Sequence, residues 1–192
     1  MNLSRVTART AAEVCGRFDI GQEAKALLRP EHSPGQYLEV LKEKNRFPAA
    51  IQFLAFALPK PEAVWWACRC VREGAGSAPP PASVAAIQAA EKWVASPTDE
   101  NRRAAMPVAQ TAGLATAAGA AALAAFVSGG SLGPASNPPV PPAETLTAQA
   151  VSGAVLVAAV QRETEKALDK FRRFLTLGIE IANGTNRWDA RR

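Results

Sequence analysis

Apolar residues recur at intervals of three and four over most of the chain, which is the spacing of an amphipathic helix. In the clearest run, Phe47, Ile51, Leu54 and Leu58 share one helical face. Alternating runs of β-branched residues, which are typical of strands, are few. Helices are therefore predicted over residues 7–18, 22–28, 34–44, 47–57, 61–73, 82–95, 98–113, 116–128, 148–160 and 163–182.

Capping signals mark several of these helix ends. Ser33 is followed by a proline and then by Gln36, which is the pattern of a capping box. Thr98 precedes two acidic residues, which the positive end of a helix dipole favours. Thr147 is predicted to cap the helix that begins at residue 148. Pro107 is predicted to kink or shorten the helix that contains it.

The stretch from residue 104 to residue 143 contains no charged side chain. Its middle part, residues 111–128, is rich in alanine, whereas residues 129–142 read GGSLGPASNPPVPP. An uncharged helix beside a proline-stiffened loop predicts a helix buried within a small helical protein, with the loop lying over it. The alternative is a membrane hairpin, but alanine contributes little to insertion and the glycines of this stretch oppose it.

These elements predict an all-α fold: a compact, irregular or orthogonal bundle of about eight to ten helices with one Gly/Pro-rich loop. At 192 residues the chain is long enough to bury a sizeable core. We divide it into an N-terminal helical extension (residues 1–34), a helical bundle domain (35–184) and a basic tail (185–192). No period of about 34 or 40 residues recurs, so a regular solenoid is not indicated.

The chain is basic, with 22 Lys and Arg against 17 Asp and Glu and a net charge of +5. Much of the excess lies near the two ends, and elsewhere basic and acidic residues are interleaved, as in residues 162–166. Nucleic-acid-binding proteins instead concentrate Lys and Arg on one face. We therefore expect a solvated surface and no nucleic-acid partner.

No group of residues has the spacing of a catalytic, metal or cofactor site. The chain has one histidine, His32, and three cysteines, Cys15, Cys68 and Cys70, whereas zinc needs three or four ligands at suitable spacing. Residues 1–20 lack the apolar core of a secretory signal, and the odd number of cysteines indicates reduced thiols. We expect a cytoplasmic protein without a bound metal or cofactor.

The most unusual segment reads EAVWWACRCVRE. At 100° per residue it has a narrow apolar stripe, with Glu62, Arg69 and Glu73 clustered on the opposite side. Trp65 and Trp66 lie at the two edges of this polar arc. Tryptophan and arginine are enriched in binding hot spots, and Arg69 is one turn from either indole, where a cation–π contact can form. Both indoles could instead pack against other helices of the same chain.

Arg102 and Arg103 lie at the start of the helix that Thr98 is predicted to cap. Their simplest role is to pair with carboxylates on neighbouring turns. They could also add positive charge to the rim of a binding surface. The candidate partner-binding residues are therefore Trp65, Trp66, Arg69, Glu62, Glu73, Arg102 and Arg103.

Several segments together resemble a bacterial family of small helical proteins known only as a domain of unknown function. These segments are FLAFALPKPEAVWWACRCV, SPTDENRRAAM, AAFVSGGSLGP, PPVPP and AVSGAVLVAAV. The resemblance covers approximately residues 37–184. It implies no activity and no catalytic residue, and it implies a loose association with gene neighbourhoods of type VI secretion.

From these observations we expect a non-enzymatic protein–protein interaction module, acting as an adaptor, a chaperone or an accessory subunit of a secretion or effector-delivery complex. Its partner would be another protein, and the chain itself would not span a membrane. Two alternatives stay open at this point. One is a membrane-associated protein that inserts residues 104–143, and the other is an enzyme on a helical scaffold.

Overall fold

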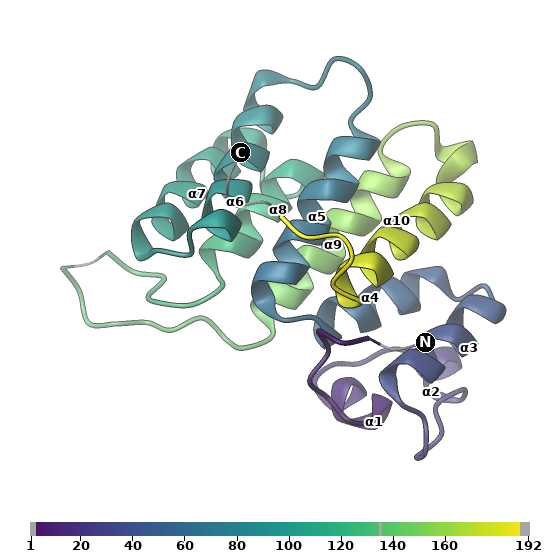
Figure 1. Ribbon diagram of the computed structural model, residues 1–192. Coiled ribbons are helices and arrows are strands. Elements are labelled where there is room, and N and C mark those ends of the chain that lie inside the picture. The colour runs from purple at the N-terminus through teal and green to yellow at the C-terminus, as the bar shows by residue number, and fades with distance from the viewer. Residues whose placement is uncertain (1–2, 135, 189–192) are drawn as a thin grey trace.

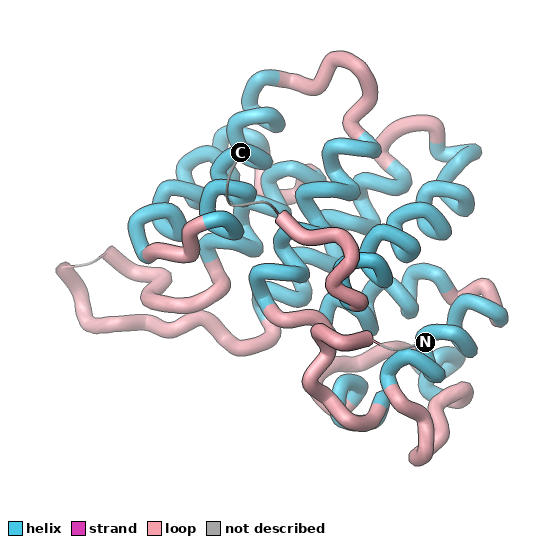
Figure 2. Tube along the Cα trace, in the orientation of Figure 1, coloured by secondary structure: helices cyan, strands magenta, loops and turns pink. Residues whose placement is uncertain are grey.

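The computed structural model describes residues 3–134 and 136–188, and within these ranges the chain is all-α, without a strand (Figures 1 and 2). The helices are α1 (Ala11–Cys15), α2 (Gln22–Lys25), α3 (Pro34–Glu43), α4 (Phe47–Ala57), α5 (Lys60–Gly74), α6 (Pro81–Ala95), α7 (Asp99–Ala112), α8 (Ala117–Phe126), α9 (Leu146–Val160) and α10 (Ala167–Ala182), with a 3₁₀ turn, η1 (Thr164–Lys166), before α10. The predicted all-α bundle is confirmed.

Helix α5 lies at the centre of the bundle, where it packs against α6, α8, α9 and α10 (Figure 1). The apolar stripe predicted for this helix is buried. The buried face is wider than predicted, because neighbours cover α5 on several sides. Its buried residues are Ala63, Val64, Trp66, Ala67, Cys68, Cys70, Val71 and Gly74.

Helix α8 confirms the buried element predicted within the uncharged stretch. Every residue of α8 except Leu123 is buried, and the helix packs against α6, α7 and α9. Small side chains allow this close packing: a Cβ at Gly119 would lie 2.1 Å from the main-chain oxygen of Gly113. In the described parts of the chain, no helix combines the length and the apolar character that crossing a membrane requires.

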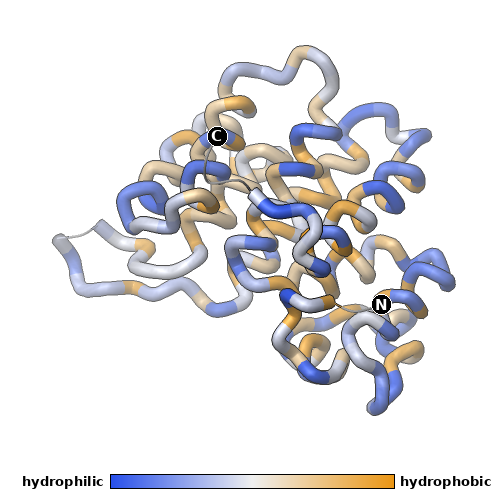
Figure 3. The backbone as a smooth tube through the Cα atoms, viewed as in Figure 1, coloured by the Kyte–Doolittle hydropathy of each residue, from blue (hydrophilic) through white to orange (hydrophobic). Residues whose placement is uncertain are grey.

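The hydropathy of the residues agrees with this packing. In Figure 3 the hydrophobic segments lie mainly in the interior of the bundle and the hydrophilic segments mainly on its outside. Residues 3–34 belong to the same packing unit, since Leu3, Ala11 and Val14 join the main hydrophobic cluster. The main-chain N–H of Arg5 also donates to the oxygen of Ala182 at the end of α10, at 2.9 Å. The N-terminal extension is thus tied directly to the last helix.

Two of the predicted caps are confirmed. The Ser33 hydroxyl accepts from the N–H of Gln36, whose side chain accepts in turn from the N–H of Ser33. Thr98 accepts from the N–H of Asn101 at the start of α7. Helix α7 continues through Pro107 to Ala112, with Gly113 as its C-cap, so of the two predicted effects of Pro107, a kink or a shortening, the shortening is wrong.

The predicted cap at Thr147 is also wrong. Helix α9 begins at Leu146, two residues earlier than predicted, and Thr147 lies buried inside its first turn. Its hydroxyl donates to the main-chain oxygen of Val127 at 3.2 Å, next to the end of α8. The Thr147 hydroxyl therefore bonds to the end of α8 and does not cap α9.

Several helices are shorter than predicted. The helix predicted over 7–18 begins only at Ala11, because the Thr10 side chain accepts from the N–H of Glu13 and fixes the start there. The helix predicted over 22–28 ends at Lys25. The last α-helix begins at Ala167, because Glu163 adopts a left-handed backbone (φ 47°) and a 3₁₀ turn follows it.

Of the predicted basic tail, the structure describes residues 185–188. Arg191 and Arg192, which account for much of its predicted charge, lie outside the described residues. Within residues 185–188, the main-chain N–H groups of Thr185 and Asn186 donate to the oxygen of Glu180 (3.0 and 3.3 Å). These bonds turn the chain back after α10, and Figure 1 shows the segment crossing α5.

Candidate functional site

Trp65 and Arg69 lie on the outer face of α5. The Trp65 indole is half-buried, and the Arg69 guanidinium lies over it, 5.7 Å from the ring centroid. The two residues are separated by one helical turn, which brings their side chains together on the surface. The predicted cation–π contact is thus present at Trp65.

A surface depression adjoins this pair, between α5, α6 and the segment that follows α10. It has a volume of about 690 Å³. We call it the Trp65 depression; its lining residues are Trp65, Arg69, Gln88, Glu91, Lys92, Ala95, Arg187 and Trp188. Two indoles thus face a shared space from elements that are far apart in the sequence.

The charges around the Trp65 depression are mostly positive. Arg69, Lys92 and Arg187 contribute cations, and Glu91 contributes one carboxylate. That carboxylate is engaged by Arg72, which donates from Nε and Nη2 to its two oxygens at 2.6 Å. Because Arg72 already neutralises Glu91, the depression presents an excess of positive charge beside aromatic surface.

The Nε1 atom of Trp65 is buried and has no hydrogen-bond partner among the described residues. A buried donor without an acceptor costs about 1–3 kcal/mol. Any contact that gives this N–H an acceptor recovers part of that free energy. Because Nε1 is buried, the accessible part of the indole is its apolar ring surface.

Trp66, in contrast, is a core residue. Its side chain is fully buried, and its Nε1 donates to the main-chain oxygen of Phe174 on α10 at 2.8 Å. The expectation that Trp66 contacts a partner is wrong for this conformation, because α10 covers the indole. Adjacent positions on a helix point about 100° apart, so one tryptophan faces inward while its neighbour reaches the surface.

The two acidic candidates do not line the Trp65 depression. Glu62 is half-buried and lines a smaller neighbouring cavity, which shares Arg187 and Trp188 with that depression. Glu73 is exposed and forms an ion pair with Arg173 on α10, with 2.9 Å between Oε1 and Nε. Glu73 therefore joins two helices of the bundle.

Arg102 and Arg103 hold the Gly/Pro-rich loop in place. Arg102 is buried and donates from Nη1 to the oxygen of Phe126 (2.7 Å) and from Nη2 to the oxygen of Ser131 (3.1 Å). Arg103 donates from Nη1 to the oxygen of Gly133 at 3.0 Å. Both also bind Asp99, so the predicted pairing within the helix is confirmed. The structure thus engages both arginines within the chain.

The cysteines and the histidine are placed as structural residues. Cys68 and Cys70 are buried free thiols, and burial raises the pKa of both. His32 accepts through Nδ1 from the N–H of Arg29 at 3.3 Å in a turn. In the ranges that the structure covers, no cluster of His, Cys, Asp and Glu is placed to hold a metal ion.

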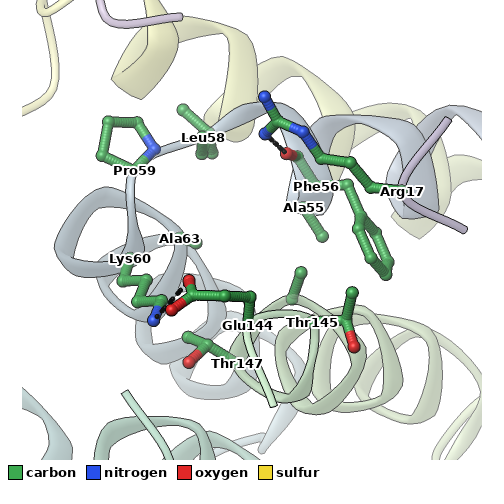
Figure 4. A pocket seen from close by; sticks show the side chains of 11 residues that line it. Arg17, Ala55, Phe56, Leu58, Pro59, Lys60, Ala63, Glu144, Thr145 and Thr147 are labelled. Carbon is green, nitrogen blue, oxygen red and sulfur yellow. Dashed lines mark hydrogen bonds and ion pairs between the residues drawn. The ribbon is translucent and has the colours of Figure 1, made fainter. Parts of the chain in front are cut away.

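The structure also reveals another cavity, which sequence reasoning missed. It has a volume of about 430 Å³ and lies where the junction of α4 and α5 meets the start of α9 (Figure 4). We call it the Lys60 pocket, after the ammonium that lies 3.2 Å from Oε2 of Glu144. Arg17, Lys60 and Glu144 come from distant parts of the chain, so no local pattern could have grouped them.

A family model, described as a family of unknown function (DUF6931), matches residues 37–182. This match spans most of the chain, from α3 to the end of α10. The chain belongs to the DUF6931 family. No curated protein and no solved structure matches it.

The family match divides the residues of the two sites. Trp65, Arg69 and Lys92 lie within the DUF6931 region, as do Lys60 and Glu144. Three contributors lie outside it: Arg187 and Trp188 complete the Trp65 depression, and Arg17 completes the Lys60 pocket. The match agrees closely with the predicted resemblance over residues 37–184, and the family's description assigns no activity.

Proposed function

We propose that this chain is a non-enzymatic protein–protein interaction module and that the Trp65 depression is its contact surface. The observation that carries this proposal is the half-buried Trp65 indole under the Arg69 guanidinium, beside a depression with excess positive charge. Tryptophan and arginine dominate binding hot spots because they bury a large area and make directional polar contacts.

The charge of the depression defines the partner that fits it best. Arg69, Lys92 and Arg187 favour a protein segment with acidic side chains, and the indoles of Trp65 and Trp188 favour an apolar side chain between them. The proposed partner segment therefore combines carboxylates with a central apolar residue.

We further propose that the module works in the cytoplasm as an adaptor, a chaperone or an accessory subunit of a bacterial secretion or effector-delivery complex. The free thiols of Cys15, Cys68 and Cys70 support a reducing compartment. The link to secretion, of the type VI kind, rests on the sequence resemblance alone.

The test compares affinity capture by the wild-type chain and by the Trp65→Ala variant, followed by measurement of Kd with the purified partner. We expect Trp65→Ala to weaken binding by about 2 kcal/mol or more, which is roughly 30-fold. Arg69→Gln should lower the association rate and reduce its salt dependence. Arg29→Ala is the matched control, since Arg29 is exposed and lies outside the depression.

The fold of each variant is checked by circular dichroism before binding is compared. A partner that binds wild type and Trp65→Ala with the same Kd would show that the contact surface lies elsewhere. A turnover of small molecules by the purified chain, unaffected by any partner, would contradict the non-enzymatic assignment.

A further inference from the structure

The Lys60 pocket has the composition of a small-molecule site. Its walls are mainly apolar, with Phe56, Leu58 and Ala63 among them, and a few polar groups converge on it. Its volume of about 430 Å³ lies within the range of ligand pockets. An apolar body could therefore be enclosed there while a polar group is held at one side.

The polar groups of the pocket favour an anion. The Lys60 ammonium donates to the main-chain oxygen of Ser128 at 2.9 Å, which holds it at the pocket wall. On the opposite side, the Arg17 guanidinium donates through Nη1 to the oxygen of Phe56 at 3.2 Å (Figure 4). Each cation thus keeps further N–H groups for other acceptors.

The first turn of α9 adds to this field. Thr145, the N-cap residue of α9, makes no side-chain hydrogen bond to that turn. Thr145, Thr147 and Ala148 all line the pocket. The N–H groups of a first helical turn have no partner within the helix, and the helix dipole there favours negative charge.

Glu144 already places a carboxylate beside the Lys60 ammonium. In Figure 4 its carboxylate points toward the Lys60 ammonium, and Oε2 lies 3.2 Å from Nζ. The Glu144 side chain is 91% exposed, however, so this ion pair is solvated and weak. A carboxylate from solution that also buries apolar surface in the pocket could replace it at Lys60.

We propose that the Lys60 pocket binds a small organic monocarboxylate with an apolar body. The ligand carboxylate binds Lys60 at the start of α9 in place of the Glu144 carboxylate, and its apolar body lies against Phe56 and Leu58. Arg17 strengthens binding from the opposite rim through its charge. This site is separate from the Trp65 depression and does not depend on the function proposed for it.

The test is an NMR titration of the full ¹⁵N-labelled chain with hexanoate, and with hexanamide as the uncharged probe of the same shape. We expect saturable shifts of the Lys60, Thr147 and Ala148 amides with hexanoate, and binding at least tenfold weaker with hexanamide. A probe of this size should bind with a Kd of about millimolar order. Equal binding of the two probes, or no saturable shift with hexanoate, would overturn the proposal.

Two variants that act in opposite directions sharpen the test. Glu144→Gln removes the competing carboxylate and should tighten hexanoate binding several-fold, whereas Lys60→Gln should weaken it tenfold or more. Glu144 is exposed, so its variant keeps the proposal testable even if Lys60→Gln fails to fold. Lys166→Gln is the control, because it breaks an exposed ion pair with Glu163 remote from the pocket. Weaker hexanoate binding by Glu144→Gln would contradict the proposed competition.

Discussion

The Trp66 indole on α5 donates a 2.8 Å hydrogen bond from Nε1 to the main-chain oxygen of Phe174 on α10. The neighbouring Trp65 indole reaches the surface, and its Nε1 has no partner among the described residues. Two adjacent residues of one type thus occupy opposite environments. The difference separates a residue that stabilises the fold from one that is available for contact.

The first prediction concerns this pair. Trp66→Ala should lower the free energy of unfolding by about 3–5 kcal/mol, because it leaves a cavity in the core and removes a buried hydrogen bond. Trp65→Ala should cost only about 1 kcal/mol, because its indole is half-buried and its donor is already unsatisfied. Urea unfolding followed by circular dichroism measures both. Equal losses for the two variants would contradict the assignment of Trp66 to the core and Trp65 to the surface.

The second prediction concerns the glycine beneath Trp66. A Cβ at Gly178 would lie 2.6 Å from Cδ2 of Leu54 and 2.7 Å from Cε2 of Trp66. Gly178→Ala should therefore destabilise the protein by about 1–3 kcal/mol through overpacking. Gly153 in α9 is the matched control, since a Cβ there meets nothing within 4 Å. Gly153→Ala should stabilise the protein by about 0.5–1 kcal/mol because alanine favours the helix. Thermal unfolding of the two variants gives the comparison, and a lower melting temperature for Gly153→Ala would be the wrong sign.

A third prediction concerns the arginines that hold the Gly/Pro-rich loop. Arg102→Ala should cost about 2–3 kcal/mol, because the buried oxygen of Phe126 loses its charged donor. Arg103→Ala should cost about 1 kcal/mol or less, because Arg103 is more exposed. Hydrogen exchange of the Leu132 and Gly133 amides should accelerate strongly in the first variant and weakly in the second. Unchanged exchange in Arg102→Ala would show that the loop is held by other contacts.

Acid should loosen the same loop. Hydrogen bonds from Arg103 and Arg102 lower the pKa of Asp99 below its usual 3.8. The stability that Asp99 contributes is therefore present above its usual pKa and is lost as the pH falls through the lowered value. Hydrogen exchange of the loop amides, corrected for the intrinsic rate, should show lower protection once the pH falls below 3.8. Asp99→Asn should remove this dependence, and its persistence in that variant would point to another carboxyl group.

A fifth prediction concerns alkaline pH. Burial raises the pKa of the Cys15 thiol from 9.0 to about 11, and burial raises the pKa of Cys68 further. Above pH 9 the unfolded chain releases thiol protons that the folded chain keeps, so the free energy of unfolding should fall as the pH rises. For Cys15 this loss extends from pH 9.0 to about 11. Urea midpoints measured across this window test it, and Cys15→Ala should show a shallower fall.

Thiol reactivity gives an independent check of the same burial. At pH 8, iodoacetamide should leave Cys68 and Cys70 unmodified in the folded protein, because both are buried as thiols. All three cysteines should react in urea. Mass spectrometry of peptides resolves the sites, and rapid labelling of Cys68 in the folded protein would contradict its placement in the core.

Local signals in the sequence determined the helices and several of their ends. The capping box of Ser33 and Gln36, the cap at Thr98 and the stop at Gly113 were all predictable, because each depends on residues within a few positions of one another. The burial of α8 was predictable as well, since a helix without polar side chains has no face for water.

Tertiary structure alone decided which residues face one another. Thr147 links α9 to the end of α8 and does not cap a helix, because the main-chain oxygen of Val127 lies within hydrogen-bond distance of its hydroxyl. Trp66 is buried because α10 packs Gly178 against its indole. The hydrogen-bond acceptor of Trp66, the oxygen of Phe174, is 108 residues away in the sequence. The Lys60 pocket likewise exists only where three distant segments meet. Periodicity and capping report on neighbours along the chain, whereas these sites depend on long-range packing that no local pattern encodes.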